Sequence, residues 1–329
     1  MLLLLVSMAQ AQVAPPIVGG TTTSDFEPVG AILALDSRGY GGQFCSGTLV
    51  DARWIVTAGH CIVEGAEPYV DQGYDIYFVL GTNVYSNNGW LDYAEVSEMH
   101  AHPNYTEGSV ESDIGVMKLA TSLGQYEMMP MNTAAPSNAW RNYDITYVGF
   151  GITGTNRDDG GVKRTVAVPF YTYDSEFIYS YDSTGTTNIC SGDSGGAALI
   201  EDRNGGFLLA GVNSFGFNIN GGQPNCEGAG AAAGATRVDA FQSFIHSYVP
   251  ESDSDTDTDS DTDTDSDTDS DTDTDVTYDD TGDLPSRPTD KGGVGTPSCA
   301  GCATGADAPL AGSVLVLALA GLVSGRRRR

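Results

Sequence analysis

The chain has 329 residues, of which 44 are acidic and 15 are basic, giving a formal net charge of −29. Such an excess of negative charge excludes a nucleic-acid backbone as a partner. A hydrophobic content of 40% excludes disorder throughout the chain, and six cysteines in this length exclude a small protein held together mainly by disulfides.

Residues 1–11 have the pattern of a secretory signal peptide. An apolar run is followed by the small-residue cleavage site Ala9-Gln10-Ala11. A positive n-region is missing, and a buried N-terminal strand is the alternative, although the Pro15-Pro16 pair would end such a strand at once. We therefore predict export, with residues 12–16 as a short propeptide and with cysteines that can pair in an oxidising compartment.

Residues 17–249 predict an all-β domain, and at about 230 residues the region is long enough to bury a sizeable core. Short apolar or alternating stretches recur between Gly, Asn, Asp and Pro residues, at 30–35, 54–57, 75–80, 145–148 and 206–212. This spacing is typical of a β-sandwich or of a pair of barrels. Only residues 238–248 have the apolar spacing of an amphipathic helix.

A glycine-flanked serine is the candidate nucleophile. In Gly192-Asp193-Ser194-Gly195-Gly196 the glycines permit a tight turn, in which backbone N–H groups can converge on an oxyanion. A serine hydroxyl needs a base, and the chain has four histidines. His60 follows a strongly apolar strand, whereas His100 and His102 lie in a polar loop and His246 in the terminal helix. Each motif alone is more often structural, but together they favour His60 and Ser194.

Five motifs occur in one order along the chain: Ile17-Val18-Gly19-Gly20, Thr57-Ala58-Gly59-His60-Cys61, Asp113-Ile114-Gly115-Val116-Met117-Lys118-Leu119, Gly192-Asp193-Ser194-Gly195-Gly196 and Ser214-Phe215-Gly216. The identity and order of these motifs resemble those of the chymotrypsin/trypsin-like serine proteases over some 230 residues. The resemblance implies two six-stranded antiparallel β-barrels followed by a short C-terminal helix. It also implies a Ser-His-Asp acyl-enzyme mechanism that hydrolyses peptide bonds in protein or peptide substrates.

The resemblance implies a role for each member of the site. Ser194 would attack the scissile carbonyl, His60 would take and return the proton, and Asp113 would hold the imidazole. Ser214 would support Asp113. The backbone N–H groups of Gly192 and Ser194 would form the oxyanion hole.

Activation and disulfide pairing are further implications of the family. A new amino terminus at Ile17 would pair with Asp193, because a buried amine needs an opposite charge. Pro16 stands where the family usually has Arg or Lys, so we expect an activating protease that is not of the trypsin type. The implied disulfides join Cys45 to Cys61 and Cys190 to Cys226.

The substrate pocket is placed by the same resemblance. Its floor would be Asn188, and the residues around it would be Ile189, Ser214, Gly216 and Ala233. Without a carboxylate at the floor, a basic side chain would lose its hydration and gain no counter-charge. We therefore predict an uncharged P1 residue, the substrate residue on the amino side of the scissile bond. An inward turn of Glu227 is the alternative, because it would restore basic specificity.

Residues 250–297 predict a disordered acidic linker. From Asp253 to Asp275 aspartate alternates with serine or threonine, so twelve carboxylates repel one another in a polar segment. Carboxylate oxygens suit calcium, and weak calcium association is the alternative, although the repeat lacks the glycines that turn a calcium loop. No other cofactor and no metal site is predicted.

Residues 298–329 contain Cys299-Ala300-Gly301-Cys302, an apolar run of eighteen residues and four terminal arginines. Eighteen helical residues span about 27 Å, just enough for a bilayer core, and the arginines would stay inside. The segment resembles the MYXO-CTERM sorting tag of exported myxobacterial and related proteins. This implies a sorting protease that acts near Cys299 or Cys302, and a plain membrane anchor is the alternative.

The leading prediction is an exported endopeptidase, either anchored at the cell surface or outer membrane or released outside the cell. A catalytically silent family member that acts as a surface-binding module is the second hypothesis. A tethered structural protein coated with calcium through its acidic repeat is the third. Nothing in the sequence requires more than a monomer.

Overall fold

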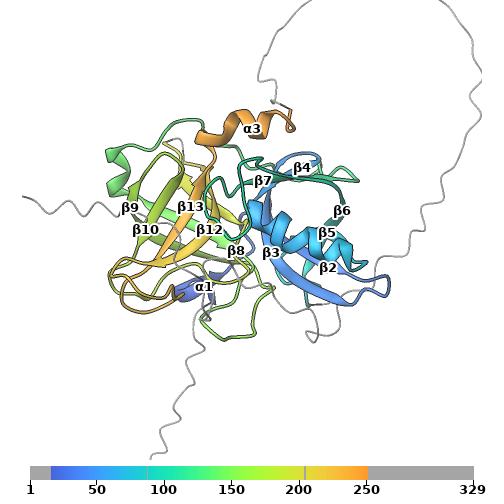
Figure 1. Cartoon of the computed structure of the whole chain (residues 1–329), viewed down its shortest axis with the longest axis horizontal. Helices are drawn as coiled ribbons and strands as arrows, with labels where there is room; N and C mark the ends of the chain where they lie inside the picture. The colour runs from blue at the N-terminus through green and yellow to red at the C-terminus, as the bar shows by residue number, and fades with distance from the viewer. Residues whose placement is uncertain (1–15, 87, 204, 251–329) are drawn as a thin grey trace, which may run out of the picture.

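The computed structural model describes residues 16–86, 88–203 and 205–250. The predictions for the signal peptide, the acidic linker and the sorting tag with Cys299 and Cys302 lie outside these residues. Within the described part, two closed six-stranded antiparallel barrels lie side by side (Figure 1). The predicted fold class is confirmed for this part of the chain.

The first barrel is closed in the order β2-β3-β4-β7-β6-β5. Its strands are β2 (Val29–Leu35), β3 (Gly41–Asp51), β4 (Trp54–Thr57), β5 (Asp75–Gly81), β6 (Trp90–Ala101) and β7 (Gly115–Leu119). Every residue of β2 is buried, and its side chains enter two different apolar clusters. Because β2 is apolar on both faces, it lies between the barrel interior and a second packed layer.

The second barrel follows the order β9-β10-β13-β12-β11-β8, and pairing of β8 with β9 closes it. Its strands are β8 (Asp144–Gly149), β9 (Arg164–Tyr173), β10 (Phe177–Tyr181), β11 (Ala197–Glu201), β12 (Phe207–Asn218) and β13 (Ala231–Arg237). The short strand β1 (Thr21–Thr22) pairs with β9. The chain before the first barrel is therefore attached to the second one.

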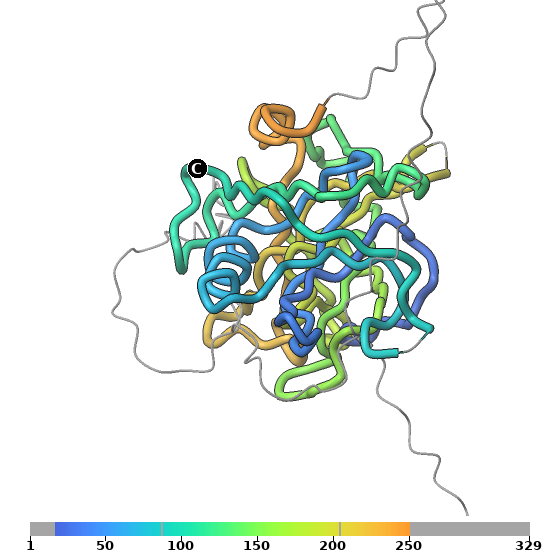
Figure 2. Tube along the Cα trace, turned by 90° about the vertical axis from the view of Figure 1, so that its right-hand side faces the viewer, coloured from blue at the N-terminus to red at the C-terminus, as the bar shows by residue number. Residues whose placement is uncertain are grey.

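The remaining elements are short: α1 (Pro16–Gly19), η1 (Cys61–Ala66), α2 (Glu67–Asp71), η2 (Asn138–Asn142), η3 (Asp239–Phe241) and α3 (Gln242–His246). The segment α1 has non-helical backbone angles at Ile17 and Val18. Both views place α3 at one end of the molecule (Figure 1, Figure 2). Among the described residues, every helix is too short to cross a membrane.

The predicted amphipathic helix over 238–248 is present but shorter, because η3 precedes α3 and α3 ends at His246. Phe241 and Ile245 are buried as the apolar spacing predicts. Tyr248 is 37% exposed and stacks on His100, with ring centres 4.1 Å apart. Tyr248, the last aromatic residue of the predicted helix face, therefore lies after the end of α3 and packs against the first barrel.

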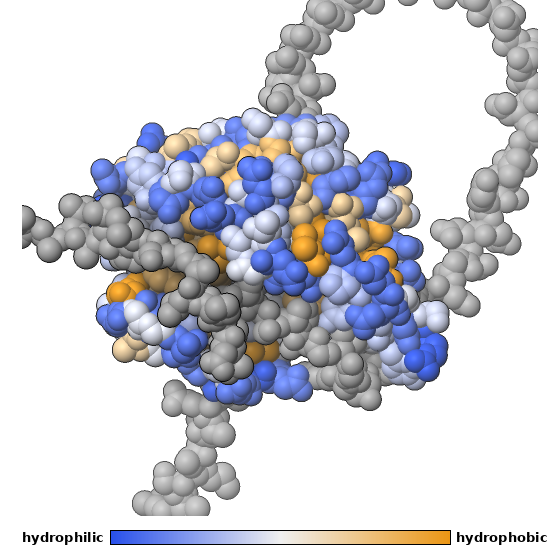
Figure 3. All heavy atoms as spheres, in the orientation of Figure 1, coloured by the Kyte–Doolittle hydropathy of each residue, from blue (hydrophilic) through white to orange (hydrophobic). Residues whose placement is uncertain are grey.

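The visible surface is mainly hydrophilic, as the space-filling view shows (Figure 3). Apolar residues form small areas on this face, separated by polar ones. Small separated apolar areas are normal for a protein surface and do not by themselves indicate a binding face.

Lys163 is a buried cation at the start of the second barrel. Lys163 is 2% exposed, and its Nζ donates a hydrogen bond to the Phe26 carbonyl at 3.0 Å. Nζ also lies 5.8 Å from the centre of the Phe150 ring. Burial lowers the pKa of Lys163 to about 8, while the negative charges of Glu27 and Asp25 act in the opposite direction.

This lowered pKa predicts a pH-dependent stability. Between pH 8 and 10 the unfolded chain keeps a lysine proton that the folded protein has released, so the lysine's contribution to the free energy of unfolding rises with pH. We expect Lys163→Met to be stabilised relative to wild type at pH 7, with this advantage shrinking by about 2 kcal/mol by pH 10. Denaturant titrations across this range measure the difference. Lys118→Met is the control, and an unchanged advantage for Lys163→Met would contradict the prediction.

Candidate active site

His60 follows the end of β4, at the side of the first barrel that faces the second. The apolar strand places Thr57 and Ala58 in the interior, and the Thr57 hydroxyl donates to the Ser46 carbonyl at 2.9 Å. A disulfide joins Cys61, the residue after His60, to Cys45 on β3. The chain is thus held to β3 at Thr57 before His60 and at Cys61 after it, and these two links restrict the position of the imidazole.

The Asp113 carboxylate is buried beside His60, with the residue 1% exposed. One oxygen, Oδ2, lies 2.8 Å from His60 Nδ1, and the other, Oδ1, accepts the His60 backbone N–H at 2.8 Å. The Ser214 hydroxyl from the second barrel also donates to Oδ2. Because an ionised carboxylate only accepts, Nδ1 carries a proton and Nε2 is the basic ring nitrogen.

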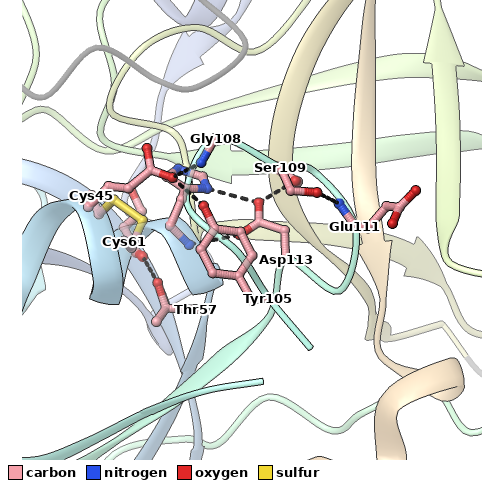
Figure 4. A network of polar contacts seen from close by, with 12 residues as sticks. Cys45, Thr57, Cys61, Tyr105, Gly108, Ser109, Glu111 and Asp113 are labelled. Atoms are coloured by element: carbon pink, nitrogen blue, oxygen red, sulfur yellow. Dashed lines mark hydrogen bonds and ion pairs between the residues drawn. A yellow bond between two sulfur atoms is a disulfide. The ribbon is translucent and has the colours of Figure 1, made fainter. Parts of the chain in front are cut away.

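Tyr105 covers this pair. A Cβ added to Gly59 would lie 3.0 Å from the Tyr105 ring and 3.3 Å from Asp113 Oδ1, so the ring packs directly on the histidine loop. The Tyr105 hydroxyl donates to the Glu64 carboxylate, and Figure 4 shows Tyr105 beside Asp113 and the Cys45–Cys61 disulfide. Burial raises the pKa of Tyr105 well above its usual value, so the phenol stays neutral.

The loop that carries Ser194 is clamped between the two barrels. Ser46 in the first barrel donates its N–H to the Ser194 carbonyl at 2.8 Å, and Gly195 donates its N–H to the Asn213 carbonyl in the second barrel at 2.8 Å. Gly195 has φ +78°, and a Cβ there would lie 2.1 Å from Thr57 Oγ1. Only glycine fits this position. Without a Cβ at Gly195, the Ser194 loop can pack against Thr57, the last residue of β4, which lies three residues before His60.

The Ser191–Gly192 and Asp193–Ser194 peptide groups have fixed orientations. The Ser191 carbonyl accepts the Ile152 N–H at 2.9 Å, and the Asp193 carbonyl accepts the Gly196 N–H at 2.9 Å. In a trans peptide the N–H points away from the carbonyl. The N–H groups of Gly192 and Ser194 therefore point away from these partners. This is the pair that the sequence predicts for the oxyanion hole.

Two side chains that the sequence analysis missed hold the Gly192–Asp193 peptide, which lies between the two donor-bearing peptide groups. Gln43 Nε2 and the Ser46 hydroxyl both donate to the Gly192 carbonyl, each at 2.9 Å. Ser46 Oγ also accepts the Phe150 N–H at 3.0 Å. No local motif marks Gln43 or Ser46, because their partners are more than 100 residues away in the chain.

Asp193 and Ile17 are both completely buried. The Asp193 carboxylate accepts the Gly151 N–H at 2.7 Å and the Cys190 N–H at 2.9 Å. In the described chain Ile17 follows Pro16 through a peptide bond and has φ 40°, a rare value for a β-branched residue. The pairing of a free Ile17 amine with Asp193 stays a prediction.

The residues predicted for the substrate pocket lie on neighbouring segments of the second barrel. Gly216 on β12 pairs with Ala233 on β13, and Ile189 is buried. Asn188 is 1% exposed, and neither atom of its side-chain amide has a hydrogen-bond partner among the described residues. An amide buried in this way costs free energy unless a ligand satisfies it.

Glu227 lies at the surface, not beside Asn188. It is exposed, and a Cβ added to Gly154 would lie 3.2 Å from both Glu227 Oε1 and Arg157 Nε. The carboxylate is therefore close to the surface loop that contains Gly154 and Arg157. This position argues against the alternative in which Glu227 supplies a negative charge to the pocket.

Two disulfides occur in the described residues, Cys45–Cys61 and Cys190–Cys226. Both confirm the predicted pairing, and disulfides are typical of proteins in oxidising compartments. The two sulfurs of the first disulfide lie close to His60. They are not thiolates, so this group lacks the donors of a zinc site.

Comparisons with known proteins agree with this geometry. Mouse vitamin K-dependent protein C is 27% identical over 259 residues, which is 72% of this chain and 52% of that protein. Bovine chymotrypsin-like elastase family member 1 is 27% identical over 71% of this chain and 89% of its own length. Trypsin from Xenopus laevis is 28% identical over 71% of this chain and 90% of its own.

The chain spans only about half of the length of the mouse protein, while it covers most of the two shorter relatives. The family model described as trypsin matches residues 17–245, which contain all the site residues described above. The chain belongs to the trypsin family.

Proposed function

We propose that this protein is a serine endopeptidase that cleaves protein substrates through an acyl-enzyme. The observation that carries the proposal is the buried Asp113 carboxylate, which holds His60 Nδ1 at 2.8 Å and accepts a hydrogen bond from Ser214. This arrangement leaves Nε2 as the basic atom of an oriented imidazole. Family membership over residues 17–245 supports the same reaction.

The proposed reaction begins when Ser194 Oγ attacks the scissile carbonyl carbon and His60 Nε2 takes the hydroxyl proton. Asp113 stays ionised and stabilises the imidazolium. His60 then donates the proton to the leaving amine, the peptide bond breaks, and an ester to Ser194 remains. A water molecule deprotonated by His60 attacks this ester, releases the second product and regenerates the serine.

The negative charge on the attacked oxygen would be stabilised by the N–H groups of Gly192 and Ser194. Each such donor is typically worth about 3 kcal/mol in the transition state. The hydrogen bonds from Gln43 and Ser46 to the Gly192 carbonyl would hold the Gly192–Asp193 peptide, which links the two donor-bearing peptide groups, as this charge develops. Pre-orientation of this kind avoids a reorganisation cost during the reaction.

Export and activation belong to the same proposal. Cleavage after Pro16 would free the Ile17 amine for Asp193, whose carboxylate is buried next to the Ser194 loop. A signal peptide, an acidic linker and a C-terminal sorting tag would bring the protease to the cell surface or release it. The two disulfides support an exported form, because they persist in oxidising compartments.

The proposed P1 preference is for an uncharged residue. Asn188 would present a neutral amide at the pocket floor, and the Glu227 carboxylate is exposed at the surface beside Gly154. A buried cation without a partner costs several kcal/mol. Peptides with leucine or another uncharged P1 residue are therefore the expected substrates.

The substitution Asn188→Asp tests this preference. We expect the ratio of kcat/KM for an arginine P1 substrate to that for a leucine P1 substrate to rise at least about 100-fold, because the new carboxylate would pair with the guanidinium. Matched peptide substrates that differ only at P1 measure the ratio. Asn220→Asp, at an exposed position in the same barrel, is the control. An unchanged ratio in Asn188→Asp would contradict the assignment of Asn188 to the pocket floor.

A further inference from the structure

One carboxylate organises the loop that leads into Asn188. Asp182 Oδ2 accepts hydrogen bonds from the hydroxyls of Thr184, Thr186 and Thr187. The same oxygen accepts the N–H groups of Thr186 and Thr187, each at 3.1 Å, while Oδ1 accepts the Thr184 N–H at 2.9 Å. We name residues 182–187 the Asp182 loop.

Partial burial alone would raise the pKa of Asp182, but the hydrogen bonds from Thr184, Thr186 and Thr187 hold it well below its usual range. The carboxylate is therefore ionised and fully used as an acceptor. In turns an aspartate side chain commonly accepts a backbone N–H two residues further along the chain. The number of donors here indicates that the conformation of the whole loop depends on this one side chain.

The Asp182 loop contacts the chain on the far side of the predicted pocket. The Gly185 carbonyl accepts the Gly228 N–H at 2.9 Å. A Cβ added to Gly185 would lie 2.3 Å from the Gly228 carbonyl oxygen, so the two backbones approach as closely as glycine allows. Gly228 lies two residues beyond Cys226, which the Cys190–Cys226 disulfide joins to the Ser194 side of the pocket.

The same loop also contacts the N-terminal segment. A Cβ on Gly19 would lie 2.2 Å from the Thr186 carbonyl oxygen. Asn188 then donates its N–H to the Val18 carbonyl at 3.1 Å. The Asp182 loop therefore contacts the backbone on both sides of the predicted pocket floor, and it lies against the segment that follows the proposed cleavage site after Pro16.

We infer that Asp182 is a positioning residue for substrate selection: the hydrogen bonds that it accepts from three threonines hold Asn188 and residues 226–228 at the spacing that accepts the P1 side chain. This inference rests on the proposed function, because it concerns the pocket of the same site. Asp182 does not contact the reacting atoms. The Ser194 loop has its own anchors, namely the Ser46 and Asn213 backbone and the Asp193 carboxylate.

Asp182 therefore affects substrate binding more than the chemical step. In Asp182→Ala we expect KM for the best uncharged P1 substrate to rise about tenfold while kcat changes less than about threefold. Discrimination between a large and a small uncharged P1 residue should also fall, because the two sides of the pocket lose their fixed spacing. Asp182→Asn keeps one acceptor oxygen and is expected to lie between wild type and Asp182→Ala.

The matched control is Asp92→Ala in the first barrel, whose carboxylate accepts hydrogen bonds from Gln125 Nε2, the Tyr126 hydroxyl and the Tyr93 N–H. It removes three hydrogen bonds to a carboxylate, against six at Asp182, and should leave KM and P1 discrimination unchanged. Kinetics are measured on the activated full chain, with thermal unfolding of each variant and active-site titration of wild type. If Asp182→Ala does not fold, Asp182→Asn supplies the test.

A wild-type KM in both Asp182 variants would overturn the inference. Equal losses of activity and thermal stability in the Asp182 and Asp92 variants would also overturn it, since they would mean a general structural role. A wild-type protein that folds and has a free Ile17 terminus, but neither titrates nor cleaves, would overturn the proposed function itself and this inference with it. The wild-type titration separates that failure from a failure of Asp182 alone.

Discussion

Ser194→Ala is expected to lower kcat for peptide hydrolysis by about 10⁶-fold, which removes measurable turnover. The reason is that the hydroxyl is the proposed bond-forming atom, and no neighbouring group can replace it. Ser194 is 5% exposed, with its carbonyl bound to Ser46 and the next residue pressed against Thr57, so the backbone should keep its conformation after truncation to alanine. Steady-state hydrolysis of a leucine P1 peptide measures the loss.

The control for this variant is Ser122→Ala, which changes an exposed serine of the first barrel and should keep full activity. Thermal unfolding should be similar in wild type and both variants. Hydrolysis by Ser194→Ala at a tenth of the wild-type rate or more would show that another residue, or a contaminating protease, performs the reaction.

Asp113→Asn is expected to lower kcat by about 10⁴-fold, as the equivalent change does in this family. An asparagine amide can donate to His60 Nδ1, and the imidazole would then carry its proton on Nε2, where it cannot accept the serine proton. The substitution keeps the shape of the side chain, and Oδ1 can still accept the His60 N–H that the structure places at 2.8 Å. We expect the fold to survive and the pH–rate profile to change.

Glu111→Gln is the matched control, because Glu111 is an exposed acid only two residues before Asp113. The double variant Ser194→Ala with Asp113→Asn adds a sharper test. Residues that act as one unit have non-additive effects, so Asp113→Asn should cause no further loss once Ser194 is alanine. A loss of less than tenfold in Asp113→Asn alone would contradict the role given to this carboxylate.

The positions of the site residues could be predicted from the sequence because each belongs to a contiguous motif. The turn around Ser194 contains its own glycines. Gly195 must be a glycine, because a Cβ at this position would lie 2.1 Å from Thr57 Oγ1. His60 follows a strand whose apolar residues mark it as interior. Both disulfides and both barrels follow from the same family resemblance.

Other parts of the site depend on contacts between distant segments. Ser46 bridges Gly192 and Phe150, and nothing near Ser46 in the sequence indicates partners more than 100 residues away. The position of Glu227 near Gly154 depends on the fold of two surface loops, so its distance from Asn188 could not be predicted. The Asp182 loop is different, because its threonines lie next to Asp182 in the sequence and their spacing could have been noticed.

The most direct test of the account is mass spectrometry of the activated full chain after reaction with a fluorophosphonate, which forms a stable ester only with an activated serine. The account predicts one adduct per molecule, located on Ser194, in protein whose amino terminus is Ile17, and no adduct after heat denaturation. A folded protein with a free Ile17 terminus and an unmodified Ser194 would contradict it.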